Sequence, residues 1–105
     1  MYTPDRWVII KVNGQSPHYR VFGSWYGGYA GSDSWRMNSG ITSVEQDEHG
    51  YKFMGSSGSL YRCGKASYGT SGYGGAVLGD IMARQPELNI QILDEQTDFM
   101  KLDYT

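Results

Sequence analysis

The residue types best suited to binding chemistry are concentrated between Trp25 and Asn38, where aromatic rings are interspersed with glycines and small polar side chains. Aromatic rings can stack on a planar base, while arginine, serine, aspartate and asparagine supply hydrogen-bond donors and acceptors. Aromatic residues beside arginine are also typical of protein–protein hot spots. The sequence therefore predicts a ligand- or partner-binding surface that consists of Trp25, Tyr26, Tyr29, Ser32, Asp33, Ser34, Trp35, Arg36, Asn38 and Arg62.

The same segment also has a purely structural interpretation. Trp25 and Trp35 could be core residues of a small barrel, with the glycines between them only allowing the chain to bend. The sequence does not say which face of a sheet this segment covers, so both interpretations stay open.

Three patterns could support catalysis or metal binding, and none of them is complete. The stretch Gly55–Ser59 lacks the G-x-S-x-G spacing of a nucleophile elbow and lies between predicted strands. Cys63 could pair with His18 or His49, but a lone cysteine on a strand is more typical of a core residue. These three residues are too widely spaced for a zinc motif, and no acidic loop has calcium-binding spacing. We therefore predict a non-enzymatic protein that uses no metal ion or cofactor.

A glycine-rich stretch, Gly72–Val77, opens a predicted helix, where backbone N–H groups and the helix dipole favour anions. It lacks the third glycine of the dinucleotide fingerprint and the lysine of a Walker loop, and no βαβ unit surrounds it. Nucleotide-dependent catalysis is therefore disfavoured, while capture of a simple anion at this position stays open.

Composition limits the class of protein. The 105 residues fit one domain, which we expect to span 1–105. The chain has 9 basic and 11 acidic residues, which argues against a binder of duplex DNA and against an acidic DNA mimic. A single cysteine suits a reducing compartment. We also see no signal peptide and no apolar run near the roughly 20 residues of a membrane span. A cytoplasmic protein without membrane contact is expected.

The periodicity predicts mainly short antiparallel strands. They are expected at residues 6–12, 18–25, 35–38, 41–46, 51–54, 59–63 and 88–93. One helix of about ten to twelve residues should begin near Ser71 and end before Pro86. The predicted fold class is α+β: an antiparallel β-meander of about six to seven short strands, forming a small barrel or curved sheet, with one helix packed on it.

Several stretches resemble small uncharacterised accessory proteins of tailed bacteriophages. They are Trp7–Val12 (WVIIKV), His18–Tyr29 (HYRVFGSWYGGY), Gly31–Ile41 (GSDSWRMNSGI) and Gly58–Cys63 (GSLYRC). The resemblance covers most of residues 2–75 and implies biological context alone. That context is the cytoplasm of an infected bacterium, where many proteins of this size redirect or disarm host systems.

We therefore expect a phage accessory protein that counters a host defence system by binding. It could sequester a small nucleotide-like signal, or it could block a host protein through the same aromatic surface. In the first case Trp25, Tyr26, Tyr29 and Trp35 would provide stacking surfaces, and Arg36 or Arg62 would contact phosphate. A homo-oligomer is expected, because one small barrel leaves little room for an internal pocket. The alternative is a structural or assembly protein, such as a minor virion component.

Overall fold

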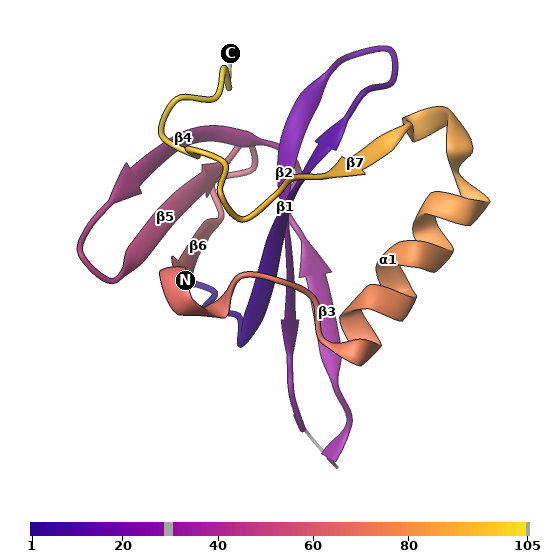
Figure 1. Ribbon diagram of the computed structural model, residues 1–105, viewed down its shortest axis with the longest axis horizontal. Coiled ribbons are helices and arrows are strands. Elements are labelled where there is room, and N and C mark those ends of the chain that lie inside the picture. The colour runs from indigo at the N-terminus through magenta and orange to yellow at the C-terminus, as the bar shows by residue number, and fades with distance from the viewer. Residues whose placement is uncertain (29–30, 105) are drawn as a thin grey trace.

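The computed structural model describes residues 1–28 and 31–104. Two antiparallel sheets and one helix form three layers, with the larger sheet in the middle (Figure 1). The strands of the larger sheet lie in the order β3-β2-β1-β7, and those of the smaller sheet in the order β4-β5-β6. The bounds are β1 Arg6–Val12, β2 His18–Trp25, β3 Ser34–Met37, β4 Ile41–Gln46, β5 Gly50–Gly55, β6 Leu60–Gly64, α1 Gly72–Arg84 and β7 Ile90–Ile92. Two short 3₁₀ helices cover Lys65–Ser67 and Pro86–Leu88.

The central strand β1 is buried on both faces, which explains its almost unbroken apolar sequence. Successive side chains in a strand point to opposite faces. Val8 and Ile10 accordingly pack toward α1, together with Phe22 of the neighbouring strand. Trp7 and Ile9 pack toward the smaller sheet. A single hydrophobic run therefore joins all three layers.

An aromatic cluster holds the two sheets together. The Trp7 ring lies 4.7 to 5.9 Å from four other rings, which belong to Tyr51, Phe53, Tyr68 and Phe99. The indole Nε1 of Trp7 donates to the carbonyl of Gly64 at 2.7 Å, so its polar atom is also satisfied. Phe99 belongs to the C-terminal segment, which is thereby fixed over the core.

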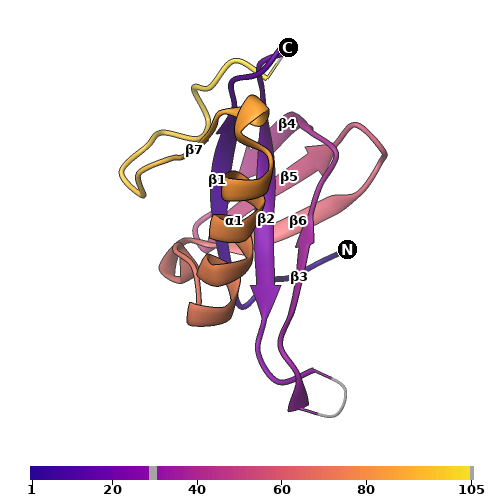
Figure 2. The same cartoon turned by 90° about the vertical axis from the view of Figure 1, so that its right-hand side faces the viewer.

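Helix α1 lies along β1 and β2 on the face opposite the smaller sheet (Figure 2). Ser71 caps it by accepting a hydrogen bond from the backbone N–H of Gly74 at 2.9 Å. A Cβ on Gly74 would lie 3.1 Å from the Ser24 Oγ of β2. The glycine-rich start of the helix therefore allows it to approach the sheet closely, which is a packing role.

The predicted fold class is confirmed: within residues 1–28 and 31–104, seven antiparallel strands and one α-helix in the C-terminal half form an α+β structure. Four predicted strand ranges shift by one or two residues at their ends. In the part of the chain that the structure describes, the strands form two separate sheets and not a closed barrel. The change of sheet occurs between β3 and β4. No helix within the described residues is long and apolar enough to span a membrane.

Candidate functional site

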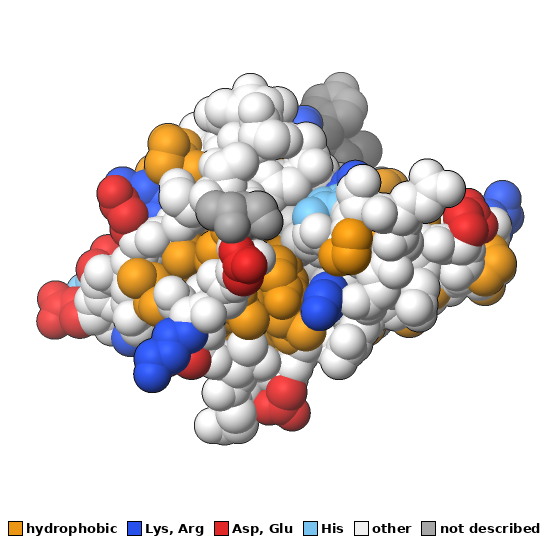
Figure 3. All heavy atoms as spheres, turned by 90° about the horizontal axis from the view of Figure 1, so that it is seen from above, with side chains coloured by type: hydrophobic (Ala, Val, Ile, Leu, Met, Phe, Trp, Pro, Cys, Tyr) orange, Lys and Arg blue, Asp and Glu red, His pale blue; other side chains and the backbone are white. Residues whose placement is uncertain are grey.

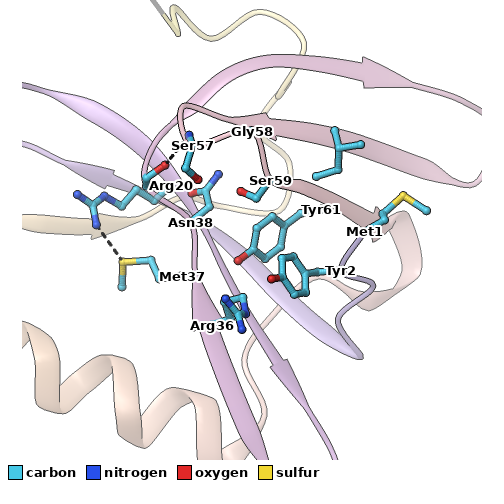
Figure 4. A pocket seen from close by; sticks show the side chains of 12 residues that line it. Met1, Tyr2, Arg20, Arg36, Met37, Asn38, Ser57, Gly58, Ser59 and Tyr61 are labelled. Atoms are coloured by element: carbon cyan, nitrogen blue, oxygen red, sulfur yellow. Dashed lines mark hydrogen bonds between the residues drawn. The ribbon is translucent and has the colours of Figure 1, made fainter.

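A hollow lies where the chain crosses from the larger sheet to the smaller one. Its volume is about 780 Å³, within the range of small-molecule sites. One wall is formed by β2, β3 and the residues after β3, and the other by the N-terminus, the β5–β6 turn and β6 (Figure 4). We call this hollow the cleft. It is lined by Met1, Tyr2, Arg20, Arg36, Met37, Asn38, Ser39, Ser57, Gly58, Ser59, Leu60 and Tyr61.

The N-terminal segment brings Tyr2 into the cleft by pairing with β6. The Tyr2 N–H donates to the Leu60 carbonyl at 2.9 Å, and the Arg62 N–H donates to the Tyr2 carbonyl at 2.8 Å. The Tyr2 ring then lies 5.1 Å from the ring of Tyr61. Trp25 meets the Tyr2 ring in an edge contact at 6.4 Å. The aromatic wall of the cleft is therefore built by residues far apart in the sequence.

Arg36 lies against this aromatic wall. Its guanidinium carbon is 4.4 Å from the centroid of the Tyr2 ring, which is a cation–π contact. Figure 4 shows Arg36 beside both tyrosine side chains. Stacking uses the flat face of the guanidinium and leaves the N–H groups at its rim available. Arg36 is exposed, so these donors can reach a ligand from solvent.

Arg20 lines the cleft from β2, beyond the point where β3 has ended. It pairs with the helix-facing Ile10, so its side chain is on the face of the larger sheet opposite to that of Arg36. The Arg20 Nε donates to His18 Nε2 at 2.8 Å, and its Nη1 donates to the Met37 sulfur at 3.7 Å. Because His18 Nε2 accepts, the ring proton must be on Nδ1, which donates to the Ser16 carbonyl at 2.7 Å. Arg20 is therefore held in place by neutral partners, and its charge is not neutralised.

Asn38 follows β3 in the cleft wall and is 4% exposed. Its Oδ1 accepts from the Val21 N–H at 2.9 Å, which fixes the orientation of the amide. Its Nδ2 has no hydrogen-bond partner among the described residues, and it faces Gly55, whose Cβ would lie 3.2 Å away. A buried donor without a partner costs about 1–3 kcal/mol.

The serine-rich β5–β6 turn completes the rim. Ser39 Oγ lies 2.7 Å from Ser56 Oγ and accepts from the Ser57 N–H at 3.1 Å. The Ser56 N–H donates to the Gly40 carbonyl at 2.8 Å. These bonds connect the turn to the crossover between the sheets, so the two walls of the cleft are tied together at this end.

The cleft is positively charged. Its lining has two arginines and no aspartate or glutamate, and neither arginine forms an ion pair with a carboxylate within the described residues. Burial raises the pKa of Tyr61 to about 12, while the charge of Arg36 acts in the opposite direction. Tyr61 is therefore a neutral side chain at physiological pH. The arrangement favours an anion.

The predicted binding residues are distributed over four places. Arg36 and Asn38 line the cleft, and Trp25 supports it from behind Tyr2, with its indole N–H donating to the Thr3 carbonyl at 2.9 Å. Trp35 lies on the opposite face of β3, because it pairs with the helix-facing Ser24, and it stacks on Phe22 at 5.5 Å. The predicted residues thus do not form one surface.

Arg62 points away from the cleft and forms an ion pair with Asp47 at 2.8 Å. The hydrogen bond from Arg62 lowers the pKa of Asp47 to about 2. This pair connects β6 to the β4–β5 turn, and the surrounding hollow is only about 70 Å³. We assign this pair a structural role.

The loop between β2 and β3 is organised by its own hydrogen bonds. The Tyr26 N–H donates to the Asp5 carboxylate and the Gly27 N–H to the Asp33 carboxylate, both at 2.9 Å. Ser32 and Ser34 are exposed and lie outside the cleft lining. Tyr29 lies outside the described residues.

The candidates for catalysis are separated in the structure. Cys63 is buried, and burial raises the pKa of its thiol, so the reactive thiolate is disfavoured. His49 is exposed in the β4–β5 turn, 3.4 Å from Glu48, while the two nitrogens of His18 are both hydrogen-bonded. No group of three or more metal-ligating side chains occurs within 1–28 and 31–104.

Most residues of the cleft lining are not among the predicted binding residues, and they include Tyr2, Arg20 and Tyr61. The alternation of side chains along a strand could have indicated Tyr61, because Tyr61 and Arg62 must face opposite sides of β6. The position of Tyr2 depends on a bridge between residues 2 and 61, and no local pattern indicates it.

No protein-family model, curated protein or solved structure shows significant similarity to this chain. The geometry of the cleft is therefore the basis for the functional proposal.

Proposed function

We propose that this chain is a non-enzymatic binding protein whose cleft holds a small, phosphate-bearing, nucleotide-like ligand. The observation that carries the proposal is the exposed Arg36, which lies in the cleft beside Tyr2 without a carboxylate partner among the described residues. Arg20 lines the same cleft from the other face of the larger sheet and also has no carboxylate partner there. Positive charge without an acidic partner in the lining of a cleft favours an anionic ligand. The volume of about 780 Å³ suits a ligand of this size.

A phosphate fits the donors of the cleft well. Guanidinium groups bind phosphate through two parallel N–H···O bonds, and such charge-assisted bonds are about twice as strong as neutral ones. The contacts of Arg36 with Tyr2 and of Arg20 with His18 hold both side chains in place before binding. Less side-chain entropy is then lost when the ligand arrives.

The biological part of the proposal is that the protein counters a host defence system by sequestering such a signal in an infected bacterium. It is supported by the resemblance of Trp7–Val12 and His18–Tyr29 to phage accessory proteins. Sequestration requires binding without turnover, and the cleft combines anion-binding groups with neutral hydroxyls. Cytoplasmic expression in the host belongs to the same proposal.

Native mass spectrometry of protein purified gently from bacteria tests for a bound ligand, and titration with ribose 5-phosphate tests the cleft directly. We expect Arg36→Gln to weaken ribose 5-phosphate binding by roughly 10-fold or more, from the loss of a charge-assisted hydrogen bond. Arg84→Gln is the matched control, because it removes the same charge from an exposed helix position paired with Asp80. The control should change the affinity less than twofold.

The proposal fails if ribose 5-phosphate does not bind the wild-type protein. It also fails if Arg36→Gln and Arg84→Gln weaken binding equally, since the attraction would then come from overall charge and not from the cleft.

A second candidate, an assembly role, is favoured by Trp35. This side chain is 41% exposed on β3, the edge strand of the larger sheet. Exposed aromatic residues on a free sheet edge are typical of self-association surfaces. Light scattering should then show an oligomer that Trp35→Ala dissociates, and a monomeric wild-type protein would contradict this role.

A further inference from the structure

The outer edge of β3 carries backbone groups that the fold leaves without partners. The Asn38 N–H donates to the Val21 carbonyl at 3.1 Å, so the backbone groups of Asn38 point toward β2. Hydrogen-bonded and non-hydrogen-bonded pairs alternate along antiparallel strands. The N–H and C=O groups of Trp35 and Met37 therefore point away from β2. No hydrogen bond within the described residues uses them, and β3 is the last strand on this side of the larger sheet.

This edge differs from the other sheet edges of the molecule. Strand β7 has only three residues, and β4 has an irregular register between Ile41 and Ser43. Tyr2 pairs with part of the free side of β6. Short strands, bulges and covered edges all discourage pairing with another chain. Strand β3 keeps a regular register with β2 over its four residues, so its outer edge is best suited to accept a further strand.

The apolar surface beside this edge is provided by Trp35. Helix α1 lies over β1 and β2, while β3 lies to one side of it (Figure 2). Trp35 is 41% exposed and stacks on Phe22 at 5.5 Å with an angle of 18° between the rings. Hydrophobic side chains seen from above the molecule are instead flanked by acidic and basic groups (Figure 3). The Trp35 ring thus presents apolar surface in a fixed orientation at a free edge.

The sequence of β3 is compatible with a second copy of itself in one register. An antiparallel partner must form its hydrogen-bonded pairs at the outward-pointing residues, Trp35 and Met37. A twofold axis at Arg36 would set two arginines directly opposite each other, which is destabilising. An axis at Ser34 or Met37 would leave half of the pairs outside β3. An axis at Trp35 sets Arg36 opposite the uncharged Ser34 of the other copy and brings the two tryptophans together.

We infer that two copies of the chain pair antiparallel along β3, with the twofold axis at Trp35. The inference rests on the assembly role proposed above and specifies the surface and the partner. The two larger sheets then continue into one sheet of eight strands, and the outward backbone groups of Trp35 gain partners. Trp35 and Arg36 lie on opposite faces of β3, so the tryptophan contact does not enter the cleft.

Disulfide formation between two variants tests the register. Ser34 and Arg36 of the two copies form a non-hydrogen-bonded pair, with Cα atoms about 4.5 Å apart. Mixed Ser34→Cys and Arg36→Cys proteins should therefore form a mixed disulfide, detected by mass spectrometry. Either variant alone places its cysteines diagonally, about 7–8 Å apart, and should form none. Ser43→Cys, on the edge strand β4, is the matched control for Ser34→Cys, and the buried Cys63 is not accessible.

A charge at the axis tests the same pairing without cysteines. Trp35→Lys sets two like charges directly opposite each other and removes the aromatic contact. It should raise the dimer dissociation constant by roughly tenfold or more in analytical ultracentrifugation. Tyr26→Lys is the control, because Tyr26 is 56% exposed and lies in the loop before β3. This control should change the dissociation constant less than twofold.

The outcomes separate the inference from the proposed functions. A dimer that forms the mixed disulfide and is weakened by Trp35→Lys supports it. A dimer in which Arg36→Cys links to itself, or in which no mixed disulfide forms, overturns the pairing and leaves the assembly role standing. A wild-type protein that stays monomeric overturns both the pairing and the assembly role, and the anion-binding cleft stands.

Discussion

Replacing Tyr68 by phenylalanine tests how the C-terminal segment, which carries Tyr104, is fixed to the central sheet. The Tyr68 hydroxyl donates to the Leu93 carbonyl at 2.6 Å and accepts from the Ile9 N–H at 3.2 Å. It therefore joins the middle of β1 to the chain that follows β7. Phenylalanine keeps the ring, including its contact with Trp7 at 4.7 Å, and removes only these two hydrogen bonds.

The expected cost follows from the two bonds. Each contributes about 1 kcal/mol net, and leaving the buried Ile9 N–H without an acceptor adds a further penalty of about 1 kcal/mol. Ile9 is 0% exposed, so solvent cannot replace the lost partner. We predict that Tyr68→Phe lowers the free energy of unfolding by about 2–3 kcal/mol. At about 4 °C per kcal/mol for a domain of this size, Tm should fall by about 8–12 °C.

Urea denaturation gives the free energy, and amide hydrogen exchange reports on the Ile9 N–H directly. Tyr26→Phe is the matched control, because Tyr26 is 56% exposed and the same hydroxyl is removed from the surface. A loss below about 0.5 kcal/mol for Tyr68→Phe, equal to that of the control and with unchanged protection at Ile9, would refute the reasoning.

The variant also changes the response to alkaline pH. Burial raises the pKa of Tyr68 to about 12. Because this value lies above the unfolded value of about 10, the neutral hydroxyl contributes its full stability below pH 10. That contribution is lost as the pH rises from 10 toward 12. Tyr68→Phe should therefore unfold less steeply than the wild type in this window, and an unchanged slope would contradict the assignment.

Three further predictions concern the scaffold. Gly50→Ala should destabilise the protein strongly, because the added Cβ would collide with the Cys63 carbonyl. Gly79→Ala, whose Cβ would have nothing within 4 Å, should stabilise the helix by about 0.5–1 kcal/mol. Equal effects of the two variants in thermal unfolding would contradict this prediction. The Cys63 thiol should resist a thiol-specific reagent until the protein is unfolded, and rapid labelling of the native state would show that it is not buried. The Arg62 hydrogen bond lowers the pKa of Asp47 to about 2. The stabilisation from this ion pair is therefore present above the usual pKa of an aspartate and is lost as the pH falls toward 2. Asp47→Asn should make the free energy of unfolding less sensitive to acid, by a small amount because the pair is partly exposed.

Local patterns were sufficient to predict most of the scaffold. β-branched and aromatic residues at Arg6–Val12 and alternation at His18–Trp25 match β1 and β2 at both ends. The Ser71 cap and the stop at Pro86 enclose α1. These features depend on neighbours within a few residues, and such neighbours are visible in a sequence. The division into two sheets depends on which strands pair over long distances, so it was not visible.

The cleft was harder to predict, because it depends on which face of a strand each side chain occupies and on pairing between segments that are distant in the sequence. Trp35 and Arg36 were expected to act on one surface, yet the twofold period of β3 places them on opposite faces. Tyr2 and Arg20 reach the cleft through the bridge to Tyr61 and through the early end of β3. Arg36 was selected for its chemistry alone, and its position over Tyr2 could not be inferred.

The polar character of the cleft follows from the way the chain changes sheets. Strand β3 has only four residues, so β2 loses its neighbour before Arg20, and backbone groups there need new partners. Asn38 accepts from the Val21 N–H at 2.9 Å and Ser39 accepts from the Ser57 N–H at 3.1 Å. Both side chains also belong to the lining of the cleft between the sheets. The residues that join the two sheets are thus the same residues that make this space suitable for a polar, anionic ligand.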